Sequence, residues 1–404
     1  MVVNLAPPKD ILPVPGIRLA AASTGRHASG RNDVLVLHCC EGTKIAGVYT
    51  QSAFAAPPIH IARDREPSAT TWVVNSGNAN AATGEPGAND ARIVCDAVAK
   101  GLGIDAGSVQ PFSTGVIGER LDVVAVSQAA GQAIKQLSAD AWIAAASAIM
   151  TTDTVAKAVS HQFVVAGQII TVTGIAKGSG MIKPNMATML AFIGCDADIP
   201  YAMLQALTKD IANASFNRIT VDGDTSTNDA MMIAATGQQT LPSGSLEQDD
   251  AMDALRNGLL VVAQQLAQAI VRDGEGATKF VTIRVSGADD ADEALCVAYT
   301  VAESPLVKTA LFAGDANWGR FCMAIGRAEV ANLDPAGVSL WLNDVQVAQG
   351  GMMAASYSEA AGAKVLAEDE FVVAIDLGRG DAAETIWTTD LSYEYIRINA
   401  EYRS

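Results

Sequence analysis

Short apolar runs of strand length alternate with longer segments of helical periodicity along the whole chain, and this mixture restricts the fold more than any other feature. The strand-like runs are 34–38, 45–49, 71–75, 109–114, 161–167, 168–177, 188–194, 278–287, 338–350, 370–378 and 393–399. Apolar residues have helical spacing in 88–103, 121–137, 139–150, 201–216 and 249–273. Asp140 is positioned to cap the third of these helices. The pattern predicts an α/β or α+β fold, with mixed β-sheets and packed helices.

The length of the chain indicates more than one core. Its 404 residues exceed the size at which a single hydrophobic core usually stops growing. Half of the residues are apolar and 18% are charged, so long disordered segments are not expected. We therefore expect two lobes.

Charge and cysteine usage limit the partners and the compartment. The net charge is −17, from 27 basic and 44 acidic residues, and such a surface repels the phosphate backbone of a nucleic acid. The chain has no run of about 18 apolar residues that would predict a membrane span. Its six cysteines form no C-x-x-C pair and mostly lie in apolar runs, which predicts reduced thiols in a cytoplasmic protein.

The segment KGSGMIKPNMATMLAFIG is the most informative stretch of the sequence. Its glycines allow unusual backbone angles, and its proline fixes one φ angle just before Ala187 and Thr188. A buried-strand run starts at Thr188. Such a junction suits an N→O acyl shift, in which the Thr188 hydroxyl attacks the carbonyl of Ala187 in a strained loop. From the residues alone, an ordinary loop before a buried strand is the commoner interpretation.

Cleavage at this bond would create a reactive group. Hydrolysis of the ester would leave Thr188 with a free α-amine, and the pKa of an α-amine in simple peptides is about 7.7–8. Such an amine can take the proton of its own hydroxyl near neutral pH, which is a known way to activate a threonine nucleophile.

Several long motifs resemble those of one family. KGSGMIKPNMATML is similar to the signature of the ornithine acetyltransferases, also called glutamate N-acetyltransferases, of arginine biosynthesis. The other similar segments, in the family's order, are NSGNANAATG, STGVIGE, MTTD, DGEGATK, FAGDANWGR and the C-terminal YEYIRINAEYRS. The resemblance covers nearly the whole chain.

The resemblance implies both a fold and a reaction. The fold expected is that of the ornithine acetyltransferases, and the chain is expected to cut itself between Ala187 and Thr188. The products are an α chain of residues 1–187 and a β chain of residues 188–404, which the family assembles as an α2β2 heterotetramer. Thr188 then carries the acetyl group from N-acetylornithine to glutamate in a ping-pong reaction.

The same resemblance assigns roles to individual residues. Thr114 and Gly115 are expected to form the oxyanion hole, and Thr188 is expected to be the nucleophile. The substrate-binding residues implied are Thr151, Thr152, Lys177, Thr188, Glu275, Asn399 and Ser404. Which of Thr151 and Thr152 contacts the substrate stays open. The ordinary alternatives are a strand-to-helix turn at Gly115, a surface lysine at 177 and a frayed C-terminal tail.

No cofactor or metal is expected. The four histidines have no ligand spacing, and DGDTSTND (222–229) has Thr227 where a calcium loop needs glycine. Some members of the family also use acetyl-CoA as a donor, and no motif settles this point here. Two other functions remain open: a self-cleaving aminopeptidase with a similar nucleophile, and a silent binding protein with an intact chain.

Overall fold

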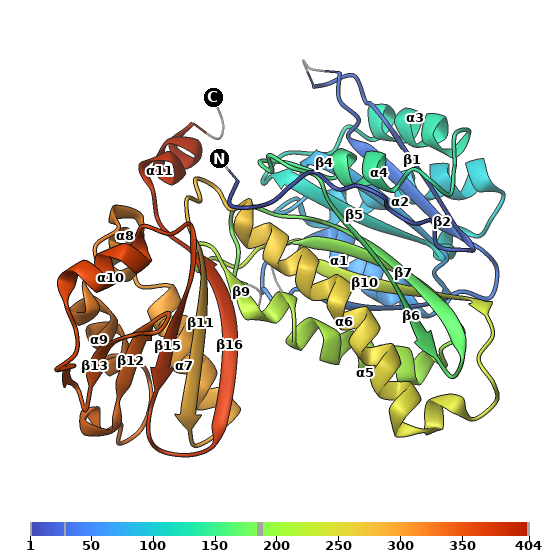
Figure 1. The fold of residues 1–404 in the computed structure, drawn as a ribbon. Helices are drawn as coiled ribbons and strands as arrows, with labels where there is room; N and C mark the ends of the chain where they lie inside the picture. Colours follow the sequence, from blue (N-terminus) through green and yellow to red (C-terminus); the bar gives the residue numbers. More distant parts are fainter. Residues whose placement is uncertain (1, 28–29, 184–188, 402–404) are drawn as a thin grey trace. The chain divides into compact units, whose positions relative to one another are not determined.

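The computed structural model describes residues 2–27, 30–183 and 189–401, which fold into two compact units (Figure 1). One unit, called unit 2 here, comprises Ala6–Asn217 and Asp224–Ile270. The other, unit 1, comprises Met1–Leu5, Arg218–Gly223 and Val271–Ser404. The mixed α/β fold and the two lobes expected from the sequence are confirmed.

Unit 2 contains two β-sheets. The four-stranded sheet has the order β1-β2-β4-β5, and the five-stranded sheet has the order β3-β10-β8-β7-β6. The strands are β1 (Ile17–Ala22), β2 (Val34–Cys39), β3 (Lys44–Tyr49), β4 (Thr71–Asn78), β5 (Val109–Val116), β6 (Lys157–Val165), β7 (Gln168–Lys177), β8 (Leu190–Ala197) and β10 (Ala230–Gln239).

The two sheets pack face to face around one apolar core. Leu35, Trp72 and Phe112 from the first sheet share a buried cluster with Phe192 and Met232 from the second. The ring of Phe192 lies 5.2 Å from that of Trp72 and 5.1 Å from that of Phe112, measured between centroids. A side chain of this size contributes about 1.5–3 kcal/mol when it is fully buried, so this cluster is a main stabilising contact between the sheets.

Helices cover the outer faces of this sandwich. The apolar residues of α2 and α3 pack with Val34, Val36 and Val73 on the outer face of the first sheet. Helix α6 covers the second sheet, since the side chains of Val262 and Leu266 lie directly over Gly174 of β7. The helices of this unit are α1 (Pro57–Arg65), α2 (Gly84–Leu102), α3 (Val123–Ile134), α4 (Trp142–Ala148), α5 (Tyr201–Asn213) and α6 (Asp249–Arg272), whose last residues belong to unit 1.

The predicted cleavage point lies, in the sequence, between two neighbouring strands of one sheet. Strands β7 and β8 are antiparallel neighbours, with Lys177 opposite Leu190, and the Ala187–Thr188 bond lies in the connection between them. The predicted N-terminal chain therefore supplies β3, β6 and β7, while the predicted C-terminal chain supplies β8 and β10 of the same sheet. Separation of the two chains would break this sheet and expose its core.

Unit 1 is built on one seven-stranded sheet of order β14-β13-β12-β15-β11-β16-β9. Helices α7 and α9 pack their apolar residues against β11, β15 and β16 in a single buried cluster. The strands are β9 (Ile219–Thr220), β11 (Phe280–Ala288), β12 (Ser339–Leu342), β13 (Val345–Gln349), β14 (Met352–Met353), β15 (Glu370–Asp376) and β16 (Ala382–Thr389). The helices are α7 (Ala291–Ala302), α8 (Pro305–Ala313), α9 (Trp318–Gly326), α10 (Glu359–Leu366) and α11 (Tyr393–Ala400).

Two local expectations are wrong. The run 393–399 is helix α11, not a strand, and no residue of this helix is buried. Ser392 caps it by accepting from the N–H of Tyr395, and Arg397 pairs with Glu394 one turn earlier. These local contacts favour a helix, and the alternating apolar residues have no sheet face to cover. Asp140 does not cap α4, because the N-cap is Ala141 and no side chain caps this end.

Within the described part of the chain, no single helix is long and apolar enough to span a membrane; the bent pair α7 and α8 meets that test by length and composition only.

Candidate active site

The two residues expected to form the oxyanion hole, Thr114 and Gly115, lie near the end of strand β5. This strand runs parallel to β4, and Gly115 lies opposite Gly77. The φ angle of Gly115 is +134°, and a Cβ atom there would lie 2.2 Å from the carbonyl carbon of Gly77. Only glycine fits this close approach of two strands. The close approach of the two strands therefore requires glycine at position 115, next to the buried Thr114. A simple turn would restrict the residue at this position less.

Lys177 lies beside Thr114. It is the last residue of β7, and its side chain is buried, so it is not a surface lysine. Its Nζ donates to Oγ1 of Thr114 at 3.1 Å. Because a hydroxyl has a single hydrogen and can accept two bonds, Thr114 accepts from Lys177 and keeps its own O–H available as a donor. A cationic neighbour also strengthens that donor.

Asp153 connects the MTTD segment with the start of the glycine-rich loop. Its Oδ1 accepts from the N–H of Gly178 at 2.8 Å and from Nζ of Lys157 at 2.7 Å. Its Oδ2 accepts from the N–H of Thr151 at 3.0 Å. The side chains of Asp153 and Lys157 are both fully buried. Asp153 thus fixes the backbone directly after Lys177.

The charge state of Asp153 follows from its neighbours. Burial alone raises the pKa of this carboxyl, but the ammonium groups of Lys157 and Lys177 and the N–H of Gly178 outweigh it. They hold the pKa of Asp153 well below its ordinary value, so the group is an anion at neutral pH. The sequence pointed to Thr151 and Thr152 and missed this carboxylate next to them.

The two threonines of the MTTD segment have different contacts. The hydroxyl of Thr152 hydrogen-bonds to that of Ser179 at 2.7 Å, so Thr152 contacts the glycine-rich loop. Thr151 uses its backbone N–H to hold Asp153. Both threonines are partly exposed, and the segment lies close to Lys177 through these contacts.

A second buried carboxylate, Asp229, lies directly before β10. Asp229 is fully enclosed, and among the residues that the structure describes no hydrogen-bond donor reaches its Oδ2. Burial holds the pKa of Asp229 well above its ordinary value, against the opposing effects of the Lys177 ammonium and the N–H of Met189. Because it interacts with the N–H of Met189, Asp229 lies beside the start of β8, the strand that follows the predicted cleavage bond. No pattern in the sequence pointed to it, since β10 itself was not expected.

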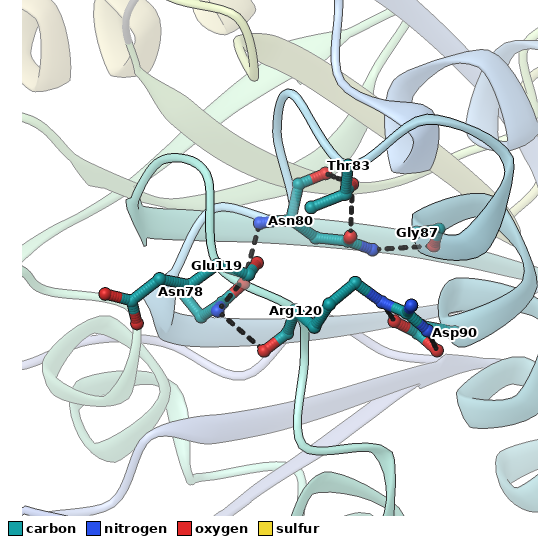
Figure 2. A network of polar contacts seen from close by, with 7 residues as sticks. All are labelled: Asn78, Asn80, Thr83, Gly87, Asp90, Glu119 and Arg120. Atoms are coloured by element: carbon teal, nitrogen blue, oxygen red, sulfur yellow. Dashed lines mark hydrogen bonds and ion pairs between the residues drawn. The ribbon is translucent and has the colours of Figure 1, made fainter.

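A polar network links the NSGNANAATG motif and α2 to the segment that follows β5 (Figure 2). Nδ2 of Asn78 donates to the carbonyl oxygens of Glu119 and Arg120 at 3.2 and 3.3 Å. The carboxylate of Asp90 accepts two bonds of 2.6 Å from the Arg120 guanidinium. Oδ1 of Asn78 also accepts from the N–H of Asn80 at 2.7 Å. The NSGNANAATG motif thus holds the segment that follows β5.

Unit 1 brings together two of the predicted substrate residues. Glu275 is buried, and its Oε2 accepts from Nδ2 of Asn399 at 2.8 Å. Asn399 belongs to α11, and the same amide group donates to the carbonyl oxygen of Tyr395 at 3.0 Å. The C-terminal segment is therefore tied to the DGEGATK loop up to this residue, and is not a frayed tail there.

The structure does not describe three of the site residues predicted from the sequence. Ala187, Thr188 and Ser404 lie outside the described residues, and their roles stay predictions. In the part of the chain that is described, no cluster of three or more His, Cys, Asp or Glu side chains is suited to hold a metal ion.

Comparisons with known proteins single out one family. A model of the ArgJ family matches residues 18–404. "Arginine biosynthesis bifunctional protein ArgJ" of Pseudomonas syringae pv. tomato is 52% identical over 405 residues, which cover all of both chains. The protein of the same description from Pseudomonas fluorescens is 51% identical over the same length. A solved structure of the ArgJ protein of Bacillus halodurans is 37% identical and covers 51% of this chain and 96% of its own, with a TM-score of 0.48.

Proposed function

This chain belongs to the ArgJ family, and we propose that it is the acetyltransferase of arginine biosynthesis that moves the acetyl group of N-acetylornithine to glutamate. The products are ornithine and N-acetylglutamate. The observation that best supports this proposal is the hydrogen bond from Lys177 to Thr114. It joins the start of the family's cleavage segment to the predicted oxyanion hole, although the two residues are far apart in the sequence.

The nucleophile arises by self-cleavage. The hydroxyl oxygen of Thr188 attacks the carbonyl carbon of Ala187, and the peptide C–N bond breaks to give an ester and a free α-amine. Water then hydrolyses the ester, which leaves a carboxylate on Ala187 and restores the Thr188 hydroxyl. Asp153 supports this step because it holds the backbone of the loop at Gly178.

The transfer has two halves that use the same groups. The α-amine of Thr188 takes the hydroxyl proton while the oxygen attacks the acetyl carbon of N-acetylornithine, and the proton then goes to the departing amine of ornithine. Glutamate reverses these steps from the acetyl ester. In each half the oxyanion accepts from the O–H of Thr114 and the N–H of Gly115, and the Lys177 ammonium strengthens the first donor.

Two of the proposed substrate contacts are charged. The ammonium group of Lys177 suits an α-carboxylate, and the carboxylate of Glu275 suits an ammonium group. Thr151, Thr152, Asn399 and Ser404 are the remaining proposed substrate contacts. The same contacts serve both halves, since both substrates are amino acids that carry an acetyl group or a free amine at the same position.

The cleaved enzyme is proposed to be a cytoplasmic α2β2 heterotetramer. The two chains stay together because they contribute strands to the same sheet. Neither a metal ion nor an organic cofactor takes part in the proposed reaction. Whether acetyl-CoA also serves as a donor stays open, because no motif of the chain settles this point.

An acceptor-dependence assay tests the proposed reaction. With N-acetylornithine alone, the purified enzyme should release one ornithine per active site, because the acetyl group stays on Thr188 when no acceptor is present. With glutamate added, ornithine and N-acetylglutamate should form continuously in equal amounts. Continuous release of ornithine and acetate without glutamate would instead favour the alternative, a self-cleaving aminopeptidase-type hydrolase.

A further inference from the structure

The proposed reaction needs two strand ends to be held at a fixed distance. One is the end of β5, which carries Thr114 and Gly115. The other is the start of β8 at Leu190, two residues after Thr188. After cleavage these ends belong to different chains, and the two strands lie in different sheets. Apolar packing between sheets is not directional, so directional bonds are needed to fix the register of the two ends.

Asn228 makes bonds of this kind. Its side chain is buried, and its Nδ2 donates to the carbonyl oxygens of Ser113 at 2.9 Å and Ala79 at 2.6 Å. Both amide hydrogens are thus used on the backbone of the N-terminal chain. One of the two acceptors is the peptide group directly before Thr114.

The side-chain oxygen and the backbone N–H of Asn228 are also held by hydrogen bonds. Its Oδ1 accepts from the hydroxyl of Thr227 at 2.5 Å, and its backbone N–H donates to Oγ of Ser226 at 3.1 Å. An amide with two carbonyl acceptors on one side and a hydroxyl donor on the other satisfies its bonds in only one orientation. Asn228 therefore cannot flip without losing contacts.

The chain leads from Asn228 into β10, the neighbour of β8 in the sheet. Asn228 lies two residues before β10, which is parallel to β8 with Ala230 opposite Leu190. The N–H of Ala230 donates to the carbonyl oxygen of Met189 at 3.0 Å. A short path of bonds therefore runs from Ser113 through Asn228 and Ala230 to Met189, the residue after Thr188.

We propose that Asn228 is a positioning residue, which sets the register between the Thr114–Gly115 oxyanion hole and β8, the strand that follows the proposed nucleophile in the sequence. This inference rests on the roles proposed for Thr114, Gly115 and Thr188. Catalytic groups lose efficiency steeply when they are displaced, by about 10²-fold for 1 Å. The substrate contacts proposed above do not include Asn228, so its loss should affect the rate of the chemical step and not the binding of the substrates.

The test uses two variants and a matched control in the full-length enzyme. Asn228→Asp keeps the shape but places an oxygen where Nδ2 now donates to two carbonyl groups, and Asn228→Ala removes the donors without adding charge. The control is Asn213→Asp, the same chemical change at an exposed residue whose side-chain oxygen accepts a bond from Asn217. Acetylation of Thr188 in a single turnover is measured along with kcat and both KM values.

The proposal predicts a split between rate and binding. In both Asn228 variants, kcat and the single-turnover acetylation rate should fall by about 10²-fold while both KM values stay within about threefold of the original. The control should match the original enzyme. A change confined to KM, or an unchanged acetylation rate, overturns the proposal. So does failure of both variants to assemble, since that would make Asn228 a folding residue. If the unaltered enzyme shows no glutamate-dependent transfer, the proposed function is wrong. The comparison of the Asn228 variants with the unaltered enzyme tests only the role of Asn228, so the two failures are distinguishable.

Discussion

The Thr188→Ala protein is expected to remain a single uncut chain and to lose acetyl transfer by about 10⁴-fold or more. The change removes the oxygen that is proposed to attack Ala187 during maturation and the acetyl group during turnover, so one substitution should block both reactions. It should not disturb the fold, because the buried strand β8 begins only at Leu190. Denaturing gel electrophoresis and the ornithine-release assay measure the two effects.

A conservative variant separates chemistry from packing. Thr188→Ser keeps the hydroxyl and the later α-amine, so it should still be cut and should still transfer acetyl groups, although more slowly. Thr188→Ala protein that is cut, or that transfers acetyl groups at the original rate, would show that another residue is the nucleophile.

The Asp153→Asn substitution is expected to give the largest loss of stability, about 3–5 kcal/mol in the free energy of unfolding. The substitution would remove the carboxylate that pairs with the fully buried Nζ of Lys157. A matched control is Asp198→Asn, which removes an exposed ion pair with Lys44 and should cost at most about 1 kcal/mol. Urea unfolding of both variants measures the difference, and equal losses would contradict a buried, charged Asp153.

The pH dependence of this loss provides a further check. The pKa of Asp153 in the folded protein is lower than its ordinary value, so its ionised form stabilises the fold. By linkage, this stabilisation is fully present above the unfolded-state pKa of about 4 and is lost as the pH falls through the lower folded pKa. The difference in stability between the original protein and Asp153→Asn should therefore shrink in acid and stay constant between neutral pH and about pH 6.

Much of the fold could be predicted from local patterns. Runs rich in β-branched residues, such as those that form β2, β4 and β7, are strands in the structure. Strand β10 was not expected because AMMIAATGQQ consists largely of alanine, methionine and glutamine, which have little preference for strands. Its position between β3 and β8 stabilises it, and that contact is invisible in a short window of sequence. Helices α7 and α8 also lay outside the expected elements, although Asp290 and Ser304 cap them.

The candidate site could be predicted only in part. The family motifs pointed to Thr114 and Lys177, and the structure brings these two residues together. They also pointed to Glu275 and Asn399, which hydrogen-bond to each other. Asp153, Asn228 and Asp229 were missed because their importance comes from burial and from partners distant in sequence. Asn228 and Asp229 lie in DGDTSTND, a segment whose composition had suggested only a defective calcium loop.

The compact units do not coincide with the chains expected after cleavage. Residues 189–217 and 224–270 fold with the N-terminal part of the sequence, and not with the rest of the predicted C-terminal chain. The proposed cut would therefore separate strands β7 and β8, which are neighbours in the same sheet.

Intact-mass spectrometry of the purified protein, with N-terminal sequencing, most directly tests whether Thr188 becomes a free N-terminal nucleophile. We expect two polypeptides, residues 1–187 and 188–404, with the second starting Thr-Met-Leu-Ala. After incubation with N-acetylornithine alone, only the second should gain the mass of one acetyl group. A single uncut chain, or an acetyl group found only on the first polypeptide, would contradict the proposed nucleophile.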